Sequence, residues 1–101
     1  MRHRPRTDGN QGVIVEALIA AGASVQILAG VGMGCPDLLV GFRGVNYLVE
    51  VKATIKPGTN ADKYLTPDEL KWHEYWKGQV WTVGSVQGAL ELIGAVERTG
   101  T

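Results

Sequence analysis

The chain has 101 residues, of which 45% are hydrophobic and 20% are charged. This composition is typical of one globular domain with a buried core, and it excludes a largely disordered protein. No apolar run approaches the roughly 20 residues that a membrane-spanning helix needs, and the basic start lacks the apolar segment of a secretory signal. A single cysteine excludes an intramolecular disulfide, so we expect a cytoplasmic protein.

The ten basic and ten acidic side chains cancel. A net charge of zero argues against strong nonspecific binding to DNA, which usually depends on a basic surface. The cations are unevenly distributed, however. Residues 1–9 carry Arg2, Arg4 and Arg6, and we expect a basic, flexible arm here that precedes a single domain over residues 10–97. The alternative is an untethered chain end without a function.

The first half of the domain is predicted to begin with a helix and a strand. Apolar side chains recur at helical spacing over residues 10–21, with Asp8 or Asn10 as a cap at the start and Gly22 at the end. Residues 24–28 form a short predicted strand. A glycine-rich bend follows and leads into more apolar sequence.

Residues 38–43 and 46–52 are two further predicted strands, and we place the loop of a hairpin at Gly44-Val45. Residues that face each other in a hairpin share one side of the sheet, as do residues two apart on one strand. Asp37, Glu50 and Lys52 should therefore emerge together. The predicted pairs are Arg43 with Asn46, Leu39 with Glu50, and Asp37 with Lys52.

In the second half, residues 53–64 lack a regular period and are predicted to be a loop. Residues 66–69 (TPDE) open a helix with a capping box and a proline in the first turn. A strand is expected at 79–83, and Ser85 caps a last helix. The buried stripe of that helix is predicted to be Ala89, Ile93 and Val96.

The predicted order is αβββαβα, with a small mixed sheet flanked by helices. This arrangement matches the α/β core of restriction endonucleases. We found no internal repeat and no low-complexity segment in the sequence.

The chemistry suggested by Asp37, Glu50 and Lys52 is metal-assisted phosphodiester hydrolysis. Mg²⁺ prefers oxygen ligands and is usually held by one or two carboxylates plus substrate phosphate. Asp37 and Glu50 supply that pair, and the backbone carbonyl of Val51 is a further candidate ligand. Lys52 would orient the attacking water or neutralise charge on the phosphorane. The alternative is that Glu50 and Lys52 are only a solvated pair on an edge strand. Their apolar surroundings argue against it.

Three segments together resemble the virus-type replication-repair nuclease (VRR-NUC) domain of the PD-(D/E)XK nuclease superfamily. They are GMGCPDLLVG (residues 32–41), YLVEVK (residues 47–52) and LTP (residues 65–67). The resemblance runs from about residue 10 to residue 93 and suggests a stand-alone domain of phage or prophage type.

The resemblance implies that Asp37 and Glu50 bind Mg²⁺ or Mn²⁺ and that Lys52 is the catalytic lysine. Family members often carry a further glutamate near the start of the first helix. Here Gln11 or Asn10 holds that position, which puts a second metal ion and full activity in question. A later family glutamine is replaced by Glu69.

The resemblance also implies a homodimer that cuts branched DNA, four-way junctions in particular. The dimer surface would be formed by exposed apolar side chains, with Trp72, Trp76 and those of the last helix as candidates. Candidate DNA contacts are the cations outside the site and one loop tyrosine: Arg4, Arg6, Arg43, Lys56, Lys63 and Tyr64. A flap or nicking nuclease fits the same residues.

Several other interpretations are open to the sequence. The glycines at 30–34 suggest a dinucleotide site, but that motif needs a helix to begin there, so we expect no nucleotide cofactor. Cys35 is predicted to be a buried thiol rather than a nucleophile, since no histidine is placed to pair with it. The three tryptophans are more typical of core or interface residues than of base-stacking ones. The main rival function is a DNA-binding or structural module that kept the fold but lost catalysis.

Overall fold

The structure is a computed structural model that describes residues 10–97. Its elements follow the predicted order, with one added 3₁₀ helix in the loop after the hairpin. They are α1 (Gln11–Ala20), β1 (Ser24–Ile27), β2 (Leu38–Phe42), β3 (Val45–Val51), η1 (Ala61–Tyr64), α2 (Pro67–Tyr75), β4 (Trp81–Val83) and α3 (Val86–Ile93). The strands predicted at 24–28, 38–43, 46–52 and 79–83 are each shifted or shortened by one or two residues.

The four strands form one mixed sheet in the order β1-β2-β3-β4. β1 pairs antiparallel with β2, and β2 pairs antiparallel with β3. β4 lies parallel to β3, because the chain crosses over through η1 and α2 before it returns. β3 is therefore an internal strand with a neighbour on each side.

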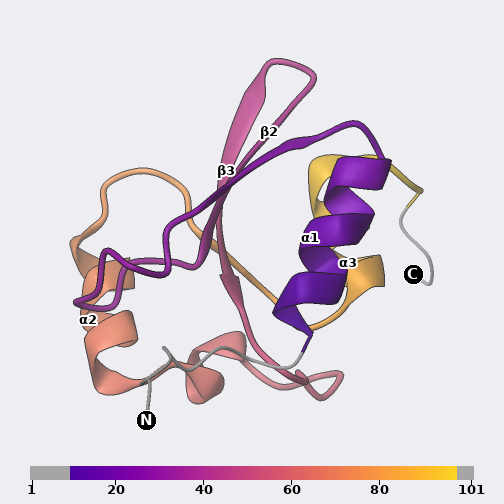
Figure 1. Cartoon of the computed structure of the whole chain (residues 1–101). Coiled ribbons are helices and arrows are strands. Elements are labelled where there is room, and N and C mark those ends of the chain that lie inside the picture. The colour runs from indigo at the N-terminus through magenta and orange to yellow at the C-terminus, as the bar shows by residue number, and fades with distance from the viewer. Residues whose placement is uncertain (1–9, 98–101) are drawn as a thin grey trace, which may run out of the picture.

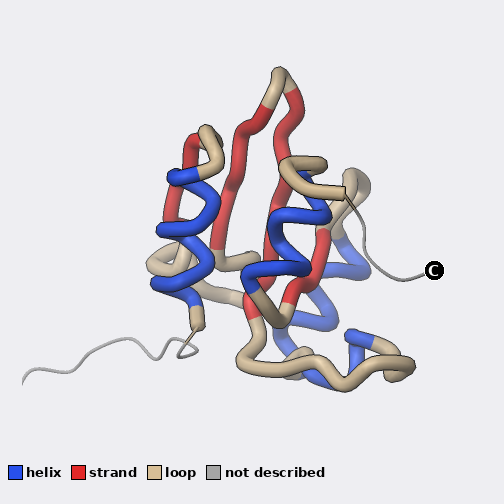
Figure 2. Tube along the Cα trace, turned by 90° about the vertical axis from the view of Figure 1, so that its right-hand side faces the viewer, coloured by secondary structure: helices blue, strands red, loops and turns tan. Residues whose placement is uncertain are grey.

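Helices lie on both sides of the sheet (Figure 1). α1 and α3 lie side by side against one face, as the turned view also shows (Figure 2), and α2 lies on the other side. The core fills the space between the sheet and the α1–α3 layer. It is formed by Ile14, Leu18, Ala23, Leu38, Val40, Phe42, Val49, Val51, Val83, Ala89 and Ile93.

The hairpin loop predicted at Gly44-Val45 is wrong. The turn is Arg43-Gly44, where both residues have a positive φ, 52° and 81°, as the preferred two-residue hairpin turn requires. Phe42 pairs with Val45, and the register differs from the predicted one by two residues. Because side chains alternate with a period of two, this shift keeps every side chain on its predicted face.

The predicted helix ends are partly correct. Gly22 follows α1 with a φ of 102°, and Ser85 Oγ accepts a hydrogen bond from the Gly88 backbone N–H at 2.9 Å. Asn10 occupies the N-cap position of α1, but its side chain makes no capping bond to that helix; Asp8 lies outside the described residues. Val96 does not join the buried stripe of α3, because that helix ends at Ile93, with Gly94 as its C-cap, and Val96 is exposed.

The tryptophans are not core residues, contrary to the first of their two predicted roles. Trp76 and Trp81 are exposed, and Trp72 is half-buried. None of the helices within residues 10–97 is long and apolar enough to cross a membrane.

Candidate active site

The end of the β2–β3 hairpin brings Asp37 and Glu50 together. Asp37 lies one residue before the last β2–β3 pair, Leu38 with Val49, so the same register places it opposite Glu50 and not opposite Lys52 as predicted. Asp37 Oδ2 accepts a hydrogen bond of 2.7 Å from the Val51 backbone N–H. Glu50 is only 2% exposed. The fold thus places a half-buried carboxylate just before β2 beside a buried carboxylate on β3.

Lys52 supplies the positive charge beside this pair. Its Nζ lies 3.6 Å from Glu50 Oε2 and 2.7 Å from Glu69 Oε1. Glu69 is also the acid of the α2 capping box, because the same Oε1 accepts a bond of 2.8 Å from the Thr66 backbone N–H. The first turn of α2 therefore holds the lysine ammonium in place against the end of β3.

The pKa values of the site acids reflect this crowding. Burial first, and then the nearby carboxylates of Asp37 and Glu69, raise the pKa of Glu50 to about 9 against the opposing effect of Lys52. Burial also raises the pKa of Asp37, although the Val51 N–H acts in the other direction. Partial burial of Glu69 is outweighed by its hydrogen bonds from Lys52 and Thr66, which lower its pKa. The single positive charge of Lys52 does not balance the negative charge that three ionised acids would carry.

Three buried side-chain oxygens among the described residues have no donor, Asn10 Oδ1 and two others. Glu50 Oε1 and Gln11 Oε1 are both buried without a hydrogen-bond partner among the described residues. Unpaired buried oxygens are costly in a folded protein. Since a hard divalent cation such as Mg²⁺ takes oxygen ligands, these two unpaired oxygens fit such an ion.

The number of possible protein ligands is small. Among residues 10–97 there is no group of three or more His, Cys, Asp and Glu side chains placed to hold a metal ion. Glu69 is engaged by Lys52. The candidate ligands are therefore Asp37 and Glu50, with the backbone carbonyl of Val51 and the amide oxygen of Gln11 as neutral additions, a set that suits an ion that keeps several waters.

The comparison with solved structures identifies the family. One structure, described as a VRR_NUC domain, aligns over 84% of this chain and 95% of its own, with a TM-score of 0.60 and 32% sequence identity. The chain belongs to the VRR-NUC family. VRR-NUC domains are nucleases, and the predicted α/β nuclease fold is confirmed by the same match. No family model matches the sequence, and no curated protein matches it.

Only part of the predicted DNA-binding set lies near the active site of this VRR-NUC domain. Lys56, Lys63 and Tyr64 belong to the loop and 3₁₀ helix that follow Lys52 directly, and the Tyr64 hydroxyl accepts a bond from the Lys56 backbone N–H. Arg43 sits in the turn at the far end of the hairpin and stacks on Phe42. With a rise of about 3.3 Å per residue along β3, it is roughly 20 Å away. Arg4 and Arg6 lie outside the described residues.

The sequence did not reveal how two residues of the VRR-NUC domain join the site. Asn10 Nδ2 donates to the carbonyls of Lys52 and Gly84, both at 3.0 Å, and so ties the start of α1 to the ends of β3 and β4. Glu69 was recognised as a capping acid and as the replacement of a family glutamine, but not as the partner of Lys52. A capping-box acid after a Glu-x-Lys strand is a weak signal, because its reach to Lys52 depends on where α2 packs.

Neither a dinucleotide site nor a nucleophilic Cys35 gains support. Residues 30–34 form a loop between β1 and β2, and no helix begins there, so the dinucleotide motif is absent from this segment. Cys35 is half-buried rather than fully buried. Burial and the nearby carboxylate of Glu50 raise its pKa, which disfavours the reactive thiolate.

Proposed function

We propose that this VRR-NUC domain is a divalent-metal-dependent endonuclease that hydrolyses phosphodiester bonds in branched DNA, with four-way junctions as the first substrate to test. The observation that supports it best is the pairing of half-buried Asp37 with buried Glu50 beside Lys52, with Glu50 Oε1 lacking a donor among the described residues. A stable protein retains such a pair when a bound cation offsets its cost.

The ligands of Mg²⁺ or Mn²⁺ would be the carboxylates of Asp37 and Glu50, with Val51 through its carbonyl oxygen. Gln11 contributes an amide oxygen, directly or through water, but no charge. When bound, the ion supplies Lewis-acid polarisation of the phosphate and a water of lowered pKa.

Lys52 acts on the phosphate itself in this proposal. Its ammonium is fixed by a charge-assisted bond of 2.7 Å to Glu69. A fixed cation loses little freedom on binding substrate and stabilises the charge that grows on the phosphorane oxygens. Asp37 is held in turn by the Val51 N–H, so that neither group has to reorganise during the reaction.

The preference for branched DNA and a homodimeric state form the finer part of the proposal. A domain of this size covers little DNA. A two-fold dimer would present two equivalent sites to two strands of one junction.

A second candidate function, a non-catalytic DNA-binding or structural module, is favoured by one observation. Gln11 stands where family members often have a carboxylate, and its side chain makes no hydrogen bond through Oε1 within the described residues. A flap or nicking nuclease would use the same site as the proposed function.

The deciding experiment compares cleavage of a labelled four-way junction, a flap and a linear duplex with Mg²⁺, Mn²⁺ or EDTA. We expect paired, metal-dependent cuts in the junction that Lys52→Ala abolishes. Lys77→Ala, which changes an exposed lysine outside the site, is the matched control and should retain cleavage. Absence of cleavage of every substrate with either metal would favour the binding module.

A further inference from the structure

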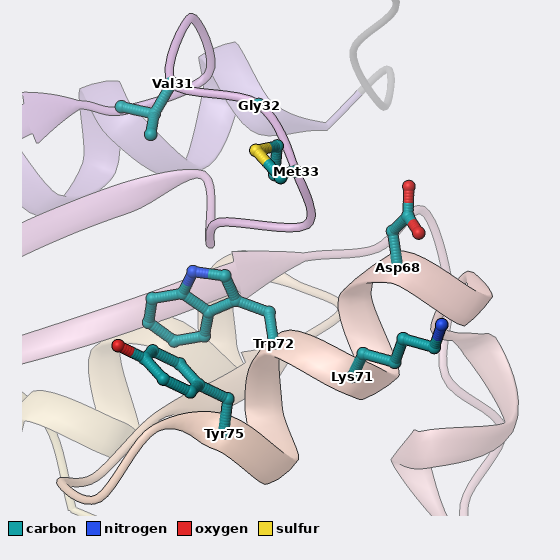
Figure 3. Close-up of a pocket in the computed structure, with 7 residues that line it drawn as sticks. All are labelled: Val31, Gly32, Met33, Asp68, Lys71, Trp72 and Tyr75. Carbon is teal, nitrogen blue, oxygen red and sulfur yellow. The ribbon is translucent and has the colours of Figure 1, made fainter.

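A second feature of the molecule is an open pocket next to the site, with a volume of about 580 Å³. One wall is the loop between β1 and β2, and the other is one face of α2. Figure 3 shows Val31 and Met33 on the loop and the rings of Trp72 and Tyr75 on the helix. Large apolar side chains thus line both walls of a concave surface that is open to solvent.

The loop wall holds its apolar side chains out of the core. Gly32, Met33 and Gly34 are consecutive residues with positive φ, 80°, 57° and 82°. This conformation is disfavoured for methionine, and Met33 is nevertheless 88% exposed. No core packing explains why the loop presents this side chain to solvent.

The helix wall is aromatic. The Trp72 ring stacks on Trp76 with centroids 4.7 Å apart and an angle of 17° between the planes, which fixes its orientation. Tyr75 is 70% exposed. Lys71 also lines the pocket and forms no salt bridge with any residue in the described range 10–97. The wall therefore combines flat aromatic rings with one cation that has no salt bridge within residues 10–97, and the acid Asp68 lies one turn before it.

The pocket shares both of its walls with the active site. A Cβ added to Gly34 would lie 2.2 Å from the Asp68 carbonyl oxygen, so the loop is seated on the first turn of α2. Gly34 is three residues before Asp37, and Asp68 directly precedes Glu69, which holds Lys52. Adjacent nucleotides of one strand are separated by only about 3.4 Å along a duplex.

We propose that this pocket receives an unstacked nucleobase of the DNA strand that enters the active site. The inference rests on the proposed function and adds its substrate class, DNA with an unpaired base beside the scissile phosphate. Stacking on aromatic rings binds any base, because every base has a flat π-face. Lys71 would contact the phosphate of the same nucleotide.

A nucleobase fits these observations better than a second protein chain does. A stable protein interface buries about 800 Å² on each partner, whereas this pocket is a short concave surface. Its walls are those that position Asp37 and Lys52, and its cation matches a phosphate. Formation of a protein interface remains a distinguishable outcome of the test.

The test measures binding of two DNAs of equal length, a flap with an unpaired strand and a continuous duplex, with Ca²⁺ replacing Mg²⁺ to prevent cleavage. The pocket variants are Tyr75→Ala and Met33→Gly. Met33→Gly removes the side chain while relieving the backbone. Trp81→Ala, an exposed aromatic on β4, is the matched control. A 2-aminopurine placed beside the cut site, or ten nucleotides away on a second probe, reports base stacking.

We expect Tyr75→Ala to weaken flap binding by roughly 5- to 150-fold, the range measured for the loss of one stacked base, and Met33→Gly to act in the same direction. Duplex binding should stay within about twofold, and Trp81→Ala should change neither. The wild-type protein should alter the fluorescence of the probe beside the cut site alone. Thermal melting confirms that each variant is folded.

Two results would overturn the base pocket while leaving the proposed function standing. One is cleavage and flap binding by both variants at the wild-type level. The other is an equal loss on both DNAs together with a change in sedimentation, which would assign the surface to a protein interface. If the wild-type protein neither binds nor cuts any DNA, the proposed function itself fails, and the pocket proposal fails with it.

Discussion

At Glu50 the fold places a carboxylate that is 2% exposed on an internal strand, next to a second acid. Burial of an incompletely paired charge costs several kcal/mol, and an entire domain is stable by only about 5–15 kcal/mol. This single residue is therefore a large liability in the absence of a ligand. Its retention is understandable if stability was exchanged for a binding site.

Replacement of Glu50 by glutamine should stabilise the metal-free protein. Because the pKa of Glu50 is raised, folding at neutral pH must either protonate this carboxyl or bury its charge. The amide keeps the shape without that cost, so we expect a gain of about 1 kcal/mol, or roughly 4–8 °C in Tm for a domain of this size. Thermal unfolding in EDTA measures it. In Mg²⁺ the wild-type Tm should rise and that of Glu50→Gln should not. A wild-type Tm that is insensitive to both Mg²⁺ and Mn²⁺ would contradict the metal site.

Gln11→Glu should have the opposite effect at the same site. A further acid at this buried position adds repulsion, and we expect the metal-free protein to lose about 1–3 kcal/mol. The added charge should also lower the Mg²⁺ concentration needed for half-maximal cleavage by about tenfold. Glu16→Gln, on the exposed side of α1, is the control for a charge change in this helix. Unchanged Mg²⁺ dependence in Gln11→Glu would place Gln11 outside the metal site.

At the scale of elements, the first turn of α2 has two separable tasks, capping its own helix and holding Lys52. Thr66→Ala removes only the capping bond, in which Thr66 Oγ1 accepts from the Glu69 N–H at 3.2 Å. We expect a loss of about 1 kcal/mol in stability and cleavage near the wild-type rate.

Glu69→Ala removes both the cap and the partner of Lys52. We expect a similar loss of stability, about 1–2 kcal/mol, but also a drop in the cleavage rate of at least about tenfold, because an untethered lysine is a poorer electrostatic partner. Melting curves and single-turnover cleavage of both variants separate the two tasks. Equal cleavage by Thr66→Ala and Glu69→Ala would show that Glu69 does not position Lys52.

The contact between the β1–β2 loop and α2 can be tested by substituting two glycines of this loop, Gly32 and Gly34, which have similar φ angles. Gly34→Ala places a methyl group against the Asp68 backbone, and we expect a loss of about 2–4 kcal/mol from the backbone conformation and the clash together. Gly32→Ala has no described atom within 4 Å of its new Cβ. It should lose only about 1–2 kcal/mol. Chemical denaturation measures the free energy of unfolding of both variants. Equal losses would mean that the contact between the β1–β2 loop and α2 does not depend on the close approach of Gly34 to Asp68.

The hairpin shows why element boundaries were predicted better than their register. The turn needs positive φ at two consecutive residues, and Arg43 is a poor match for the first position although Gly44 suits the second. The sequence therefore favoured a turn beginning at the glycine. An error of an even number of residues left the faces of Asp37 and Glu50 unchanged, because the pleat repeats every two residues.

For the whole molecule, the net charge of zero makes DNA binding dependent on where charges lie and on bound metal. In EDTA we expect weak binding of a four-way junction. Ca²⁺ should tighten it by at least about tenfold, because the ion neutralises carboxylates that would repel phosphate. Fluorescence anisotropy over roughly 50–200 mM salt measures both effects, and Asp37→Asn should remove the Ca²⁺ effect. Tight binding in EDTA would contradict this.

The sequence by itself determined the order αβββαβα, the capping of α2 and α3, and the placement of Asp37, Glu50 and Lys52 on one side of the sheet. These features follow from local periods and from residue chemistry that acts over a few positions. Asp37 and Glu50 could be recognised from the sequence because an acid is unusual beside so many apolar residues. Asp37 directly precedes the apolar strand β2, and Glu50 lies within the apolar strand β3.

Only the tertiary structure decided which distant residues complete the site. Glu69 reaches Lys52 across 17 residues, and Asn10 reaches the carbonyl of Lys52 across 42. Such contacts depend on how α1 and α2 pack on the two sides of the sheet, which is set by the whole core. The pocket between Met33 and Tyr75 arises in the same way, because two segments that are separate in sequence meet where Gly34 seats against Asp68.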